Sequence, residues 1–316
     1  MKAAIVTALL VMPCVAWAYP VKPIRVVVPF APGGSTDILI RTVGQKLGEQ
    51  LGHSLVIDNR GGGGGAIGAA LAARSPADGY TLMATTSGVV VVNQSLYRKL
   101  AYDPIADFAP VAIIASLPNM LVVSPSLPVA SVKELIALAK IKPGALTFAS
   151  GGNGTSNHLA GELLKFLAGV SLTHVPYKGG GPAVLATMSG EVTLLFATMP
   201  SAIPQVKAGK LKALAVTSRK RAEVAPELPT MMEAGIREFE VATWVGLLAP
   251  RGTSDAYIKR LHEEVSKALQ SPQVAARLRA EGYDPVGSTP QEMATVIKGE
   301  SAMWARVVKA AGITAD

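Results

Sequence analysis

A short segment near the start of the chain has the composition of an anion-binding loop. It follows an apolar strand, opens a helix and reads Phe30-Ala31-Pro32-Gly33-Gly34-Ser35-Thr36-Asp37. Its two glycines let the backbone turn sharply. A helix start adds unpaired N–H donors and a partial positive charge. These features together can bind a carboxylate or a phosphate without a cationic side chain. The alternative is an ordinary strand-to-helix turn capped by Ser35 or Thr36.

Two later segments have the same construction. Residues 150–157 follow a strand expected at 147–149 and precede a helix, and residues 177–182 occupy an equivalent position. Because ligands bind outside the carboxyl ends of parallel strands, we expect the three loops to face one cleft. The hydroxyl-bearing loops at 86–88 and 198–200 occupy further strand ends, although many short polar loops look like these. The candidate ligand-binding residues are Phe30, Pro32, Gly33, Gly34, Ser35, Thr36, Asp37, Ser87, Ser150, Gly154, Thr155, His158, Tyr177, Lys178 and Thr198.

Three of the larger side chains have two interpretations each. His158 lies in the first turn of its helix and either touches a ligand or packs against His174 or Tyr177. Lys178 either pairs with a carboxylate or stays solvated. Trp244 either lines the cleft or is buried in a core.

Other chemistries are disfavoured. Gly63, Gly65 and Gly68 satisfy the dinucleotide fingerprint, but the next strand lacks the acidic residue that the fingerprint requires about 20 positions on. We therefore expect these glycines to permit close packing of an alanine-rich helix at 66–73. The four histidines have no metal-site spacing, and the chain has no nucleophile-elbow motif. The sequence thus predicts neither an enzyme nor a bound cofactor.

Composition limits the class of partner. The chain has 316 residues, of which 49% are hydrophobic and 16% charged, so it can bury substantial cores. The formal net charge is +8, but the basic residues are scattered and aromatic residues make up only 5%. A nucleic-acid groove needs a clustered basic stripe with aromatic residues. We therefore expect a basic, soluble surface, no nucleic-acid partner and a monomer.

Residues 1–18 have the features of an export signal. Lys2 is followed by an apolar run at 3–15 and by the small-x-small sequence Ala16-Trp17-Ala18. The run is too short to span a membrane comfortably. The single cysteine, Cys14, lies inside this segment, so a mature chain beginning at Tyr19 has neither disulfides nor thiol chemistry. The sequence predicts a periplasmic location.

Apolar runs alternate with helical stretches along most of the chain. Strands are expected at 24–28, 55–57, 82–85, 111–114, 121–123, 147–149, 192–196 and 211–216. Helices are indicated by an apolar stripe at 39, 43, 47 and 51 and by capping boxes that begin at Ser131 and Thr289. This alternation predicts an α/β fold with largely parallel sheets covered on both faces.

The chain is expected to cross twice between two lobes. No long linker is present, and the last third changes to three helical stretches that start near 254, 271 and 289. We place the crossings near 119–123 and 241–248. The first lobe then combines residues 19–120 with 243–316, and the second lobe is residues 121–242.

Five ordered motifs resemble the Bug (Bordetella uptake gene) family, the substrate-binding proteins of tripartite tricarboxylate transporters. The resemblance covers the mature chain, and its motifs lie at 29–37, 102–108, 158–162, 175–179 and 209–217. It implies a two-lobed Venus flytrap fold. It also implies a carboxylate ligand held by main-chain donors and waters from the first glycine loop and the facing lobe, and membrane transporter subunits as partners.

This sequence departs from the family at two positions. The family commonly has Asp where this chain has Thr193 and Ala197. Loss of a carboxylate would weaken a site for a ligand amine and relieve repulsion of a second ligand carboxylate. We therefore expect a di-acid without an amino group, aromatic di-acids included. The alternative function is a periplasmic ligand-sensing subunit of a two-component signalling system.

Overall fold

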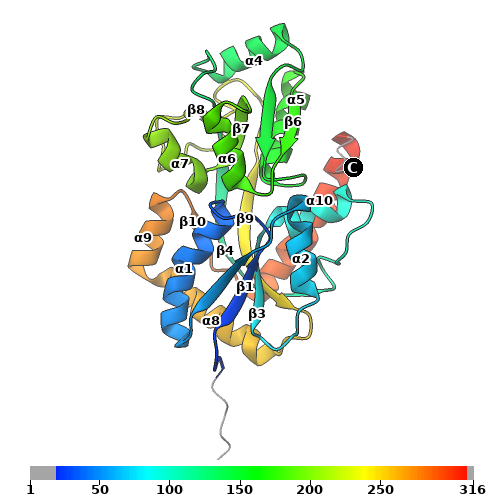
Figure 1. Cartoon of the computed structure of the whole chain (residues 1–316), viewed down its shortest axis with the longest axis vertical. Helices are drawn as coiled ribbons and strands as arrows, with labels where there is room; N and C mark the ends of the chain where they lie inside the picture. The colour runs from blue at the N-terminus through cyan, green and yellow to red at the C-terminus, as the bar shows by residue number, and fades with distance from the viewer. Residues whose placement is uncertain (1–18, 312–316) are drawn as a thin grey trace, which may run out of the picture.

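The computed structural model describes residues 19–311 and shows two lobes, one above the other in Figure 1. The predicted export signal at 1–18 lies outside the described residues. Across the described part of the chain, no helix is long and apolar enough to cross a membrane.

The first lobe contains a mixed sheet. Its strands run in the order β2-β1-β3-β9-β4, with β1 parallel to both of its neighbours and β9 antiparallel to β3 and β4. The short β10 pairs with the outer edge of β4. The strand bounds are β1 Ile24–Val28, β2 Leu55–Asn59, β3 Thr81–Thr86, β4 Phe108–Val123, β9 Ala242–Pro250 and β10 Asp284–Pro285.

The second lobe is built on the far end of β4. From Asn119 onward β4 pairs with β7 on one side and, from Met120, with β8 on the other, and β5 pairs in parallel with β6 and β7. The remaining bounds are β5 Thr147–Ser150, β6 Thr173–Pro176, β7 Leu194–Thr198 and β8 Lys212–Val216.

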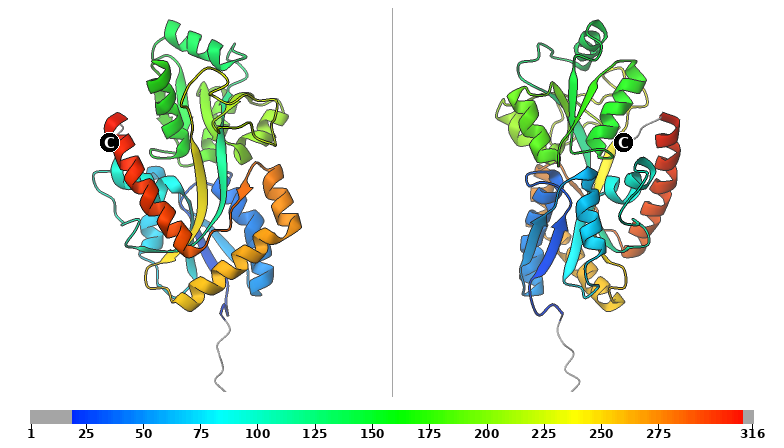
Figure 2. Two further views of the ribbon diagram at one scale, coloured as in Figure 1. Left: turned by 180° about the vertical axis from the view of Figure 1, so that it is seen from behind. Right: turned by 45° about the vertical axis from the view of Figure 1, so that its right-hand side comes forward.

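Helices cover the sheets of both lobes (Figures 1 and 2). The first lobe carries α1 Ser35–Leu51, α2 Ala66–Ala73, α3 Asn93–Leu96, α8 Asp255–Gln270, α9 Pro272–Ala280 and α10 Pro290–Ala311. The second lobe carries α4 Val132–Ile141, α5 Ser156–Ala168, α6 Gly180–Ser189 and α7 Met199–Lys207. Two single-turn segments, η1 Gly63–Gly65 and η2 Gly88–Val92, precede α2 and α3.

Each lobe has its own hydrophobic core. The largest cluster joins the first-lobe sheet to α1, α8 and α10, and two further clusters lie on the two faces of the second-lobe sheet. The predicted stripe on α1 is confirmed, because Leu39, Val43, Leu47 and Leu51 are all buried in the first cluster. Full burial of one such side chain contributes about 1.5–3 kcal/mol, which explains how this stripe holds α1 against the sheet.

The strands expected at 111–114 and 121–123 are one strand, and this expectation is corrected. β4 runs unbroken through 16 residues, although it contains Pro110 and Pro118. Its register against β9 shifts after Pro110 and again after Ile113, and at Pro118 it reaches the end of its pairing with β9. The prolines are tolerated because irregular positions of a ladder do not need every N–H group. A single strand therefore passes from one lobe into the other.

Both predicted capping boxes begin helices. At α10 the Thr289 N–H group donates to Glu292 Oε2 at 2.8 Å, and the Glu292 N–H group donates back to Thr289 Oγ1 at 3.2 Å. At α4 the Ser131 hydroxyl accepts from the Glu134 N–H group at 3.2 Å. Caps of this kind are worth about 1 kcal/mol each.

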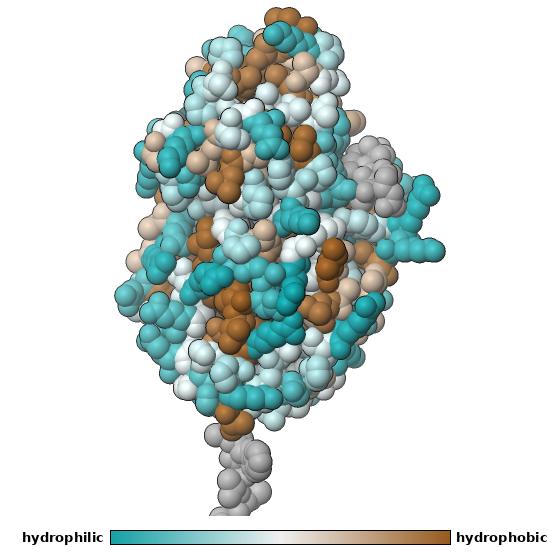
Figure 3. Space-filling view, viewed as in Figure 1, coloured by the Kyte–Doolittle hydropathy of each residue, from teal (hydrophilic) through white to brown (hydrophobic). Residues whose placement is uncertain are grey.

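Apolar side chains on the surface are dispersed. On the face drawn in Figure 3, hydrophobic residues gather in separate patches with hydrophilic residues between them. The exposed large apolar side chains include Ile67 and Leu71 of α2, Phe166 of α5 and Leu185 of α6.

Candidate functional site

A small cavity lies between the lobes, where the carboxyl ends of four strands meet. The last residues of β3 and β7, the loops after β1 and β5 and the starts of α1, α5 and α6 supply its walls. Its volume is about 30 Å³, enough for about two water molecules. The lining residues are Phe30, Gly34, Ser35, Thr36, Thr86, Gly151, Thr155, Ser156, Asn157, Gly180 and Thr198.

Four helices begin at this cavity. The N-terminal residues of α1, α5 and α6 line it, and Thr198, the N-cap of α7, lines it as well. The four N-caps are Gly34, Thr155, Gly179 and Thr198, and none of these described residues makes a side-chain capping bond. The alternative in which Ser35 or Thr36 caps α1 is therefore wrong. The first N–H groups of each helix remain available to an anion, and the helix dipoles reinforce one another there.

The cavity wall is polar and uncharged. None of the eleven described residues that line it carries a charged side chain. Buried polar atoms near it lack partners: within residues 19–311, neither Thr86 Oγ1 nor Asn119 Nδ2 has a hydrogen-bond partner. Asn119 Oδ1 accepts from Ser156 Oγ at 3.2 Å, so this amide lies directly behind the wall. A buried polar group without a partner is costly, so these atoms are suited to a polar ligand or to water.

Asp37 shapes the first loop and does not line the cavity. Its carboxylate accepts from the Gly33 N–H group at 3.0 Å, from Arg41 Nε at 3.0 Å and from Asn59 Nδ2 at 3.1 Å. Burial opposes the ionisation of Asp37, but the bonds from Arg41, Gly33 and Asn59 outweigh it and hold its pKa below the usual range. The sequence predicted Asp37 as a ligand-binding residue, whereas its contacts here hold the turn of the loop.

His158 supports the second loop from behind. Its Nδ1 accepts from the Gly154 N–H group at 3.2 Å, and its ring lies 4.4 Å from that of His174 between centroids. His174 Nε2 lies 2.6 Å from Ser150 Oγ, which in turn accepts from the Gly152 N–H group at 3.0 Å. Of the two interpretations of His158, packing against His174 is the one the geometry shows.

Burial lowers the pKa of both rings to about 4. For His158 the nearby charge of Lys165 adds to this effect, and for His174 the charges of His158 and Lys165 add to it while Glu162 opposes it. Both imidazoles are therefore neutral near pH 7, and the neutral His158 ring is the form that can accept the loop hydrogen bond.

The other predicted residues lie around the cavity without lining it. Tyr177 donates its hydroxyl to Glu191 Oε1 at 2.7 Å, and Lys178 is exposed. Ser87 Oγ lies 2.9 Å from Thr243 Oγ1 on β9. Trp244 is buried, and its Nε1 donates to Glu300 Oε2 at 3.0 Å. The predicted residues that the structure brings together at the cavity are Phe30, Gly34, Ser35, Thr36, Thr155 and Thr198; Pro32, Gly33, Ser150 and Gly154 belong to the same loops but lie outside its lining.

Five lining residues were not among the candidates. Thr86, Gly151, Ser156, Asn157 and Gly180 are all one or two residues from a predicted position, inside the loops that the sequence identified. A rule that favours the last strand residue and the first helical residue of each loop would have found Thr86, Ser156 and Gly180, since these are the positions where strand ends and helix starts meet.

Thr193 and Ala197, the two departures noted in the family resemblance, lie outside the cavity lining. Thr193 Oγ1 accepts from the Thr147 N–H group at 2.7 Å and so links the start of β7 to β5. Ala197 is buried in a second-lobe cluster and pairs with Met120 of β4.

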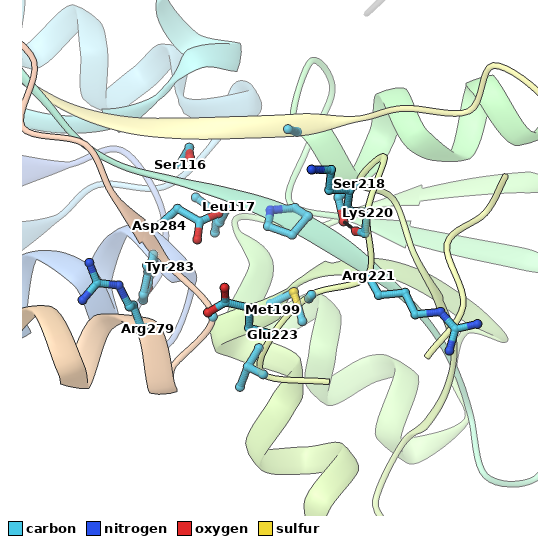
Figure 4. A pocket seen from close by; sticks show the side chains of 15 residues that line it. Ser116, Leu117, Met199, Ser218, Lys220, Arg221, Glu223, Arg279, Tyr283 and Asp284 are labelled. Carbon is cyan, nitrogen blue, oxygen red and sulfur yellow. Dashed lines mark hydrogen bonds between the residues drawn. The ribbon is translucent and has the colours of Figure 1, made fainter. Parts of the chain in front are cut away.

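A larger cavity, of about 250 Å³, opens beside β4 between α9 and the loop at 218–224 (Figure 4). Its walls carry several charged side chains, and Asp284 and Glu223 approach each other from opposite lobes while Arg221 points away. Burial, with Glu223 nearby, raises the pKa of Asp284. No residue of the three glycine loops lines this cavity, so the smaller, uncharged cavity at the helix starts is the better candidate site. Nowhere in residues 19–311 do three or more metal-ligating side chains form a group that could hold a metal ion.

The sequence matches a known family model over most of its length. Residues 39–313 match TctC, described as the tripartite tricarboxylate transporter family receptor. Protein BugT of Bordetella pertussis is 38% identical over 98% of this chain and 95% of its own length. A Pseudomonas protein encoded in the tcbD–tcbE intergenic region is 40% identical over 92% of this chain and 87% of its own length.

Solved structures show the same architecture. A Rhodopseudomonas palustris protein with adipate is 41% identical and superposes with a TM-score of 0.91, covering 94% of this chain and 99% of its own. MatC from Rhodopseudomonas palustris with bound malate is 34% identical, with a TM-score of 0.87 over 92% of this chain and all of its own. The periplasmic binding protein BugD is 33% identical, with a TM-score of 0.91 over 94% of this chain and 99% of its own.

Proposed function

Since this chain belongs to the TctC family of tripartite tricarboxylate transporter receptors, in which Bug proteins also fall, we propose that it captures a small dicarboxylate in the periplasm and delivers it to a membrane transporter. The family consists of solute-binding receptors and not of enzymes, and two similar structures contain adipate and malate. The lobes divide, in this proposal, at 120/121 and 242/243, and the protein acts as a monomer.

The observation that carries the proposal is the set of four uncapped helix N-termini around an uncharged cavity. Main-chain donors and helix dipoles attract a carboxylate, and because the donors come from both lobes, one ligand can bridge them. Because no cationic side chain among the described residues lines the site, ligand binding depends on the distance between the helix N-termini of the two lobes.

A ligand without an amino group fits this wall best. An ammonium group needs a carboxylate or several acceptors, and otherwise its desolvation is not compensated. The nearby acids are already engaged: Asp37 is paired with Arg41, and Glu162 accepts from Lys165 Nζ at 2.8 Å. Ala197 supplies no charge.

Titration calorimetry with matched pairs tests the ligand class. Succinate should bind more tightly than aspartate, and adipate more tightly than 2-aminoadipate, at one pH and ionic strength. A thermal-shift screen of carboxylates comes first, because a ligand at 100 times its Kd stabilises the folded protein by about 2.7 kcal/mol. Tighter binding of the amino acid in both pairs would show that an acid reaches the cavity and would reject the proposed ligand class.

Delivery to a transporter is tested in cells. Deletion of the gene should abolish high-affinity uptake of the carboxylate that the purified protein binds, and re-expression of the wild-type chain should restore it. Unchanged uptake after deletion would contradict the transport role.

A further inference from the structure

The glycine run at 61–65 has no role in the cavity wall. It connects β2 to α2 and includes the single turn η1, and Gly62, Gly63, Gly64 and Gly65 all have positive φ angles. Gly68, further along α2, packs against Pro29, where a Cβ atom would lie 2.6 Å from the Pro29 Cα; the expected close packing of this helix is thus confirmed for Gly68. Gly62 and Gly65 pack closely against Ile67 and Val89 of the first lobe, which leaves Gly61 and Gly64 unexplained.

The run touches the second lobe through bare backbone. A Cβ atom on Gly61 would lie 2.5 Å from the Lys178 carbonyl oxygen, and one on Gly64 would overlap the Asn153 carbonyl oxygen. From the other side, a Cβ atom on Gly152 would lie 2.9 Å from the Gly64 Cα. Real Cβ atoms do not approach other atoms so closely, so these contacts exist only because both surfaces lack side chains. In the right-hand view of Figure 2, the loops at the upper end of the first lobe meet those at the lower end of the second.

The neighbouring loops repeat this arrangement. The Ala31 N–H group donates to the Lys178 carbonyl oxygen at 2.8 Å, which makes a backbone hydrogen bond between the lobes. A Cβ atom on Gly179 would lie 2.9 Å from the Ala31 nitrogen, and one on Gly181 would overlap the Pro32 carbonyl oxygen. The second-lobe partners lie in the loops that lead directly into α5 and α6, whose N-termini line the cavity.

We propose that Gly61 and Gly64 of the glycine run are the first-lobe half of an interlobe latch, whose second-lobe half is formed by residues 152–154 and 177–181. The latch forms only when the lobes are closed, and it sets the distance between the helix N-termini that hold the ligand. Its glycines are positioning residues that act through α5 and α6 and slow the escape of the ligand. The inference rests on the proposed function, since it assigns this latch to the carboxylate cavity.

The chain provides a closely matched pair of variants. Gly63 and Gly64 are adjacent in η1 and have φ angles of 54° and 55°, so alanine strains the backbone equally at both. A Cβ atom on Gly63 would meet only Ala66 and Ile67 of its own lobe, at 3.6 Å and 4.0 Å. One on Gly64 would overlap the Asn153 carbonyl oxygen of the second lobe and would also lie 3.0 Å from the Tyr97 hydroxyl, the end of a side chain in its own lobe. Gly64→Ala should therefore raise the dissociation rate of adipate or malate about tenfold or more above that of Gly63→Ala, at similar melting temperatures.

A second variant avoids the backbone strain of a positive φ angle. Gly181 lies in the first turn of α6 without a positive φ angle, and alanine is the stronger helix former. Gly181→Ala should keep or raise the melting temperature of the ligand-free protein and still weaken carboxylate retention, because its Cβ atom would meet Pro32 of the first lobe. A purely structural role for this glycine could not produce that combination.

Lobe separation is measured directly, with or without ligand. Spin labels on Lys99→Cys in the first lobe and Lys140→Cys in the second report the interlobe distance, and both sites are exposed. The latch predicts a longer distance, or a smaller closed fraction, in Gly64→Ala and Gly181→Ala than in Gly63→Ala. Equal distances and equal dissociation rates in all three variants would overturn it. If the wild-type protein binds neither adipate nor malate, the proposed ligand class fails, while the distance measurement still decides whether the latch exists.

Discussion

At the scale of single residues, the candidate site depends on main-chain groups and neutral side chains. The sequence identified its loops because glycine and hydroxyl residues recur after strands, but it could not tell which side chains turn inward. Asp37 and Lys178 are the clearest examples. Asp37 bonds to its own loop, and Lys178 contributes its carbonyl group to the interlobe contact. The direction of a side chain depends on partners far away in sequence, such as Asn59 for Asp37.

Thr86 offers a direct test of the cavity wall. Its hydroxyl is buried without a partner among the described residues and lines the cavity, whereas Thr85 also has a buried hydroxyl without a partner but lies outside the lining. Thr86→Val should weaken dicarboxylate binding about tenfold, which corresponds to about 1.4 kcal/mol. Thr85→Val should leave affinity unchanged. Calorimetry on both variants checks this, and equal losses of affinity would place the ligand elsewhere.

At the scale of elements, a stack of three rings holds the second loop. Phe148 of β5 and His174 of β6 stack at 4.7 Å between centroids, and His158 of α5 extends the stack. The loop N–H groups of Gly152 and Gly154 are fixed by Ser150 and His158 respectively. Because α5 begins just after this loop, the stack helps to aim the helix N-terminus at the cavity.

The stack predicts acid sensitivity. The pKa values of His158 and His174 are about 4 in the folded protein and near 6.5 in an unfolded chain. Between these values the unfolded chain binds more protons, so stability is fully present above about pH 6.5 and is lost as the pH falls toward 4. The melting temperature of the ligand-free protein should decline through this range.

A neutral replacement separates this effect from general acid unfolding. His158→Asn keeps an acceptor for Gly154 but cannot be protonated, so its melting temperature should depend less steeply on pH between 6.5 and 4. His53→Gln, at the far end of α1, should keep the wild-type profile. Parallel profiles for all three proteins would contradict the assignment.

The limits of prediction are visible in β4 and β7. The sequence predicted two strands, at 111–114 and 121–123, where pairing with β9 holds one continuous strand together. β7 begins at Leu194 and not at 192, because the residues before it form the turn after α6. By contrast, the periodic stripe of α1 and the caps of α4 and α10 were predicted correctly, since these signals are local.

At the scale of the whole molecule, the lobes lie too close for ligand entry. The cavity has a volume of about 30 Å³, which is room for about two water molecules. A dicarboxylate needs several times the volume of one water molecule. Admission therefore requires the lobes to separate about the two strands that join them, β4 and β9, as in other hinged binding proteins.

Small-angle scattering checks this motion. Saturating dicarboxylate should lower the radius of gyration of the wild-type protein, because the ligand bridges donors from both lobes. An amino-acid analogue that does not bind serves as the matched control at the same concentration. An identical radius with and without bound ligand would mean that entry needs only local loop movement.

The position of β9 has a consequence for how the chain acquires its structure during synthesis. β9 lies between β3 and β4 in the sheet but follows both of them by more than a hundred residues, with α4–α7 in between. The sheet of β5–β8 can therefore be completed first, while β3 and β4 wait for their shared neighbour. Chains that end before residue 242 would leave the facing edges of β3 and β4 unpaired, and unpaired edges of this kind promote aggregation.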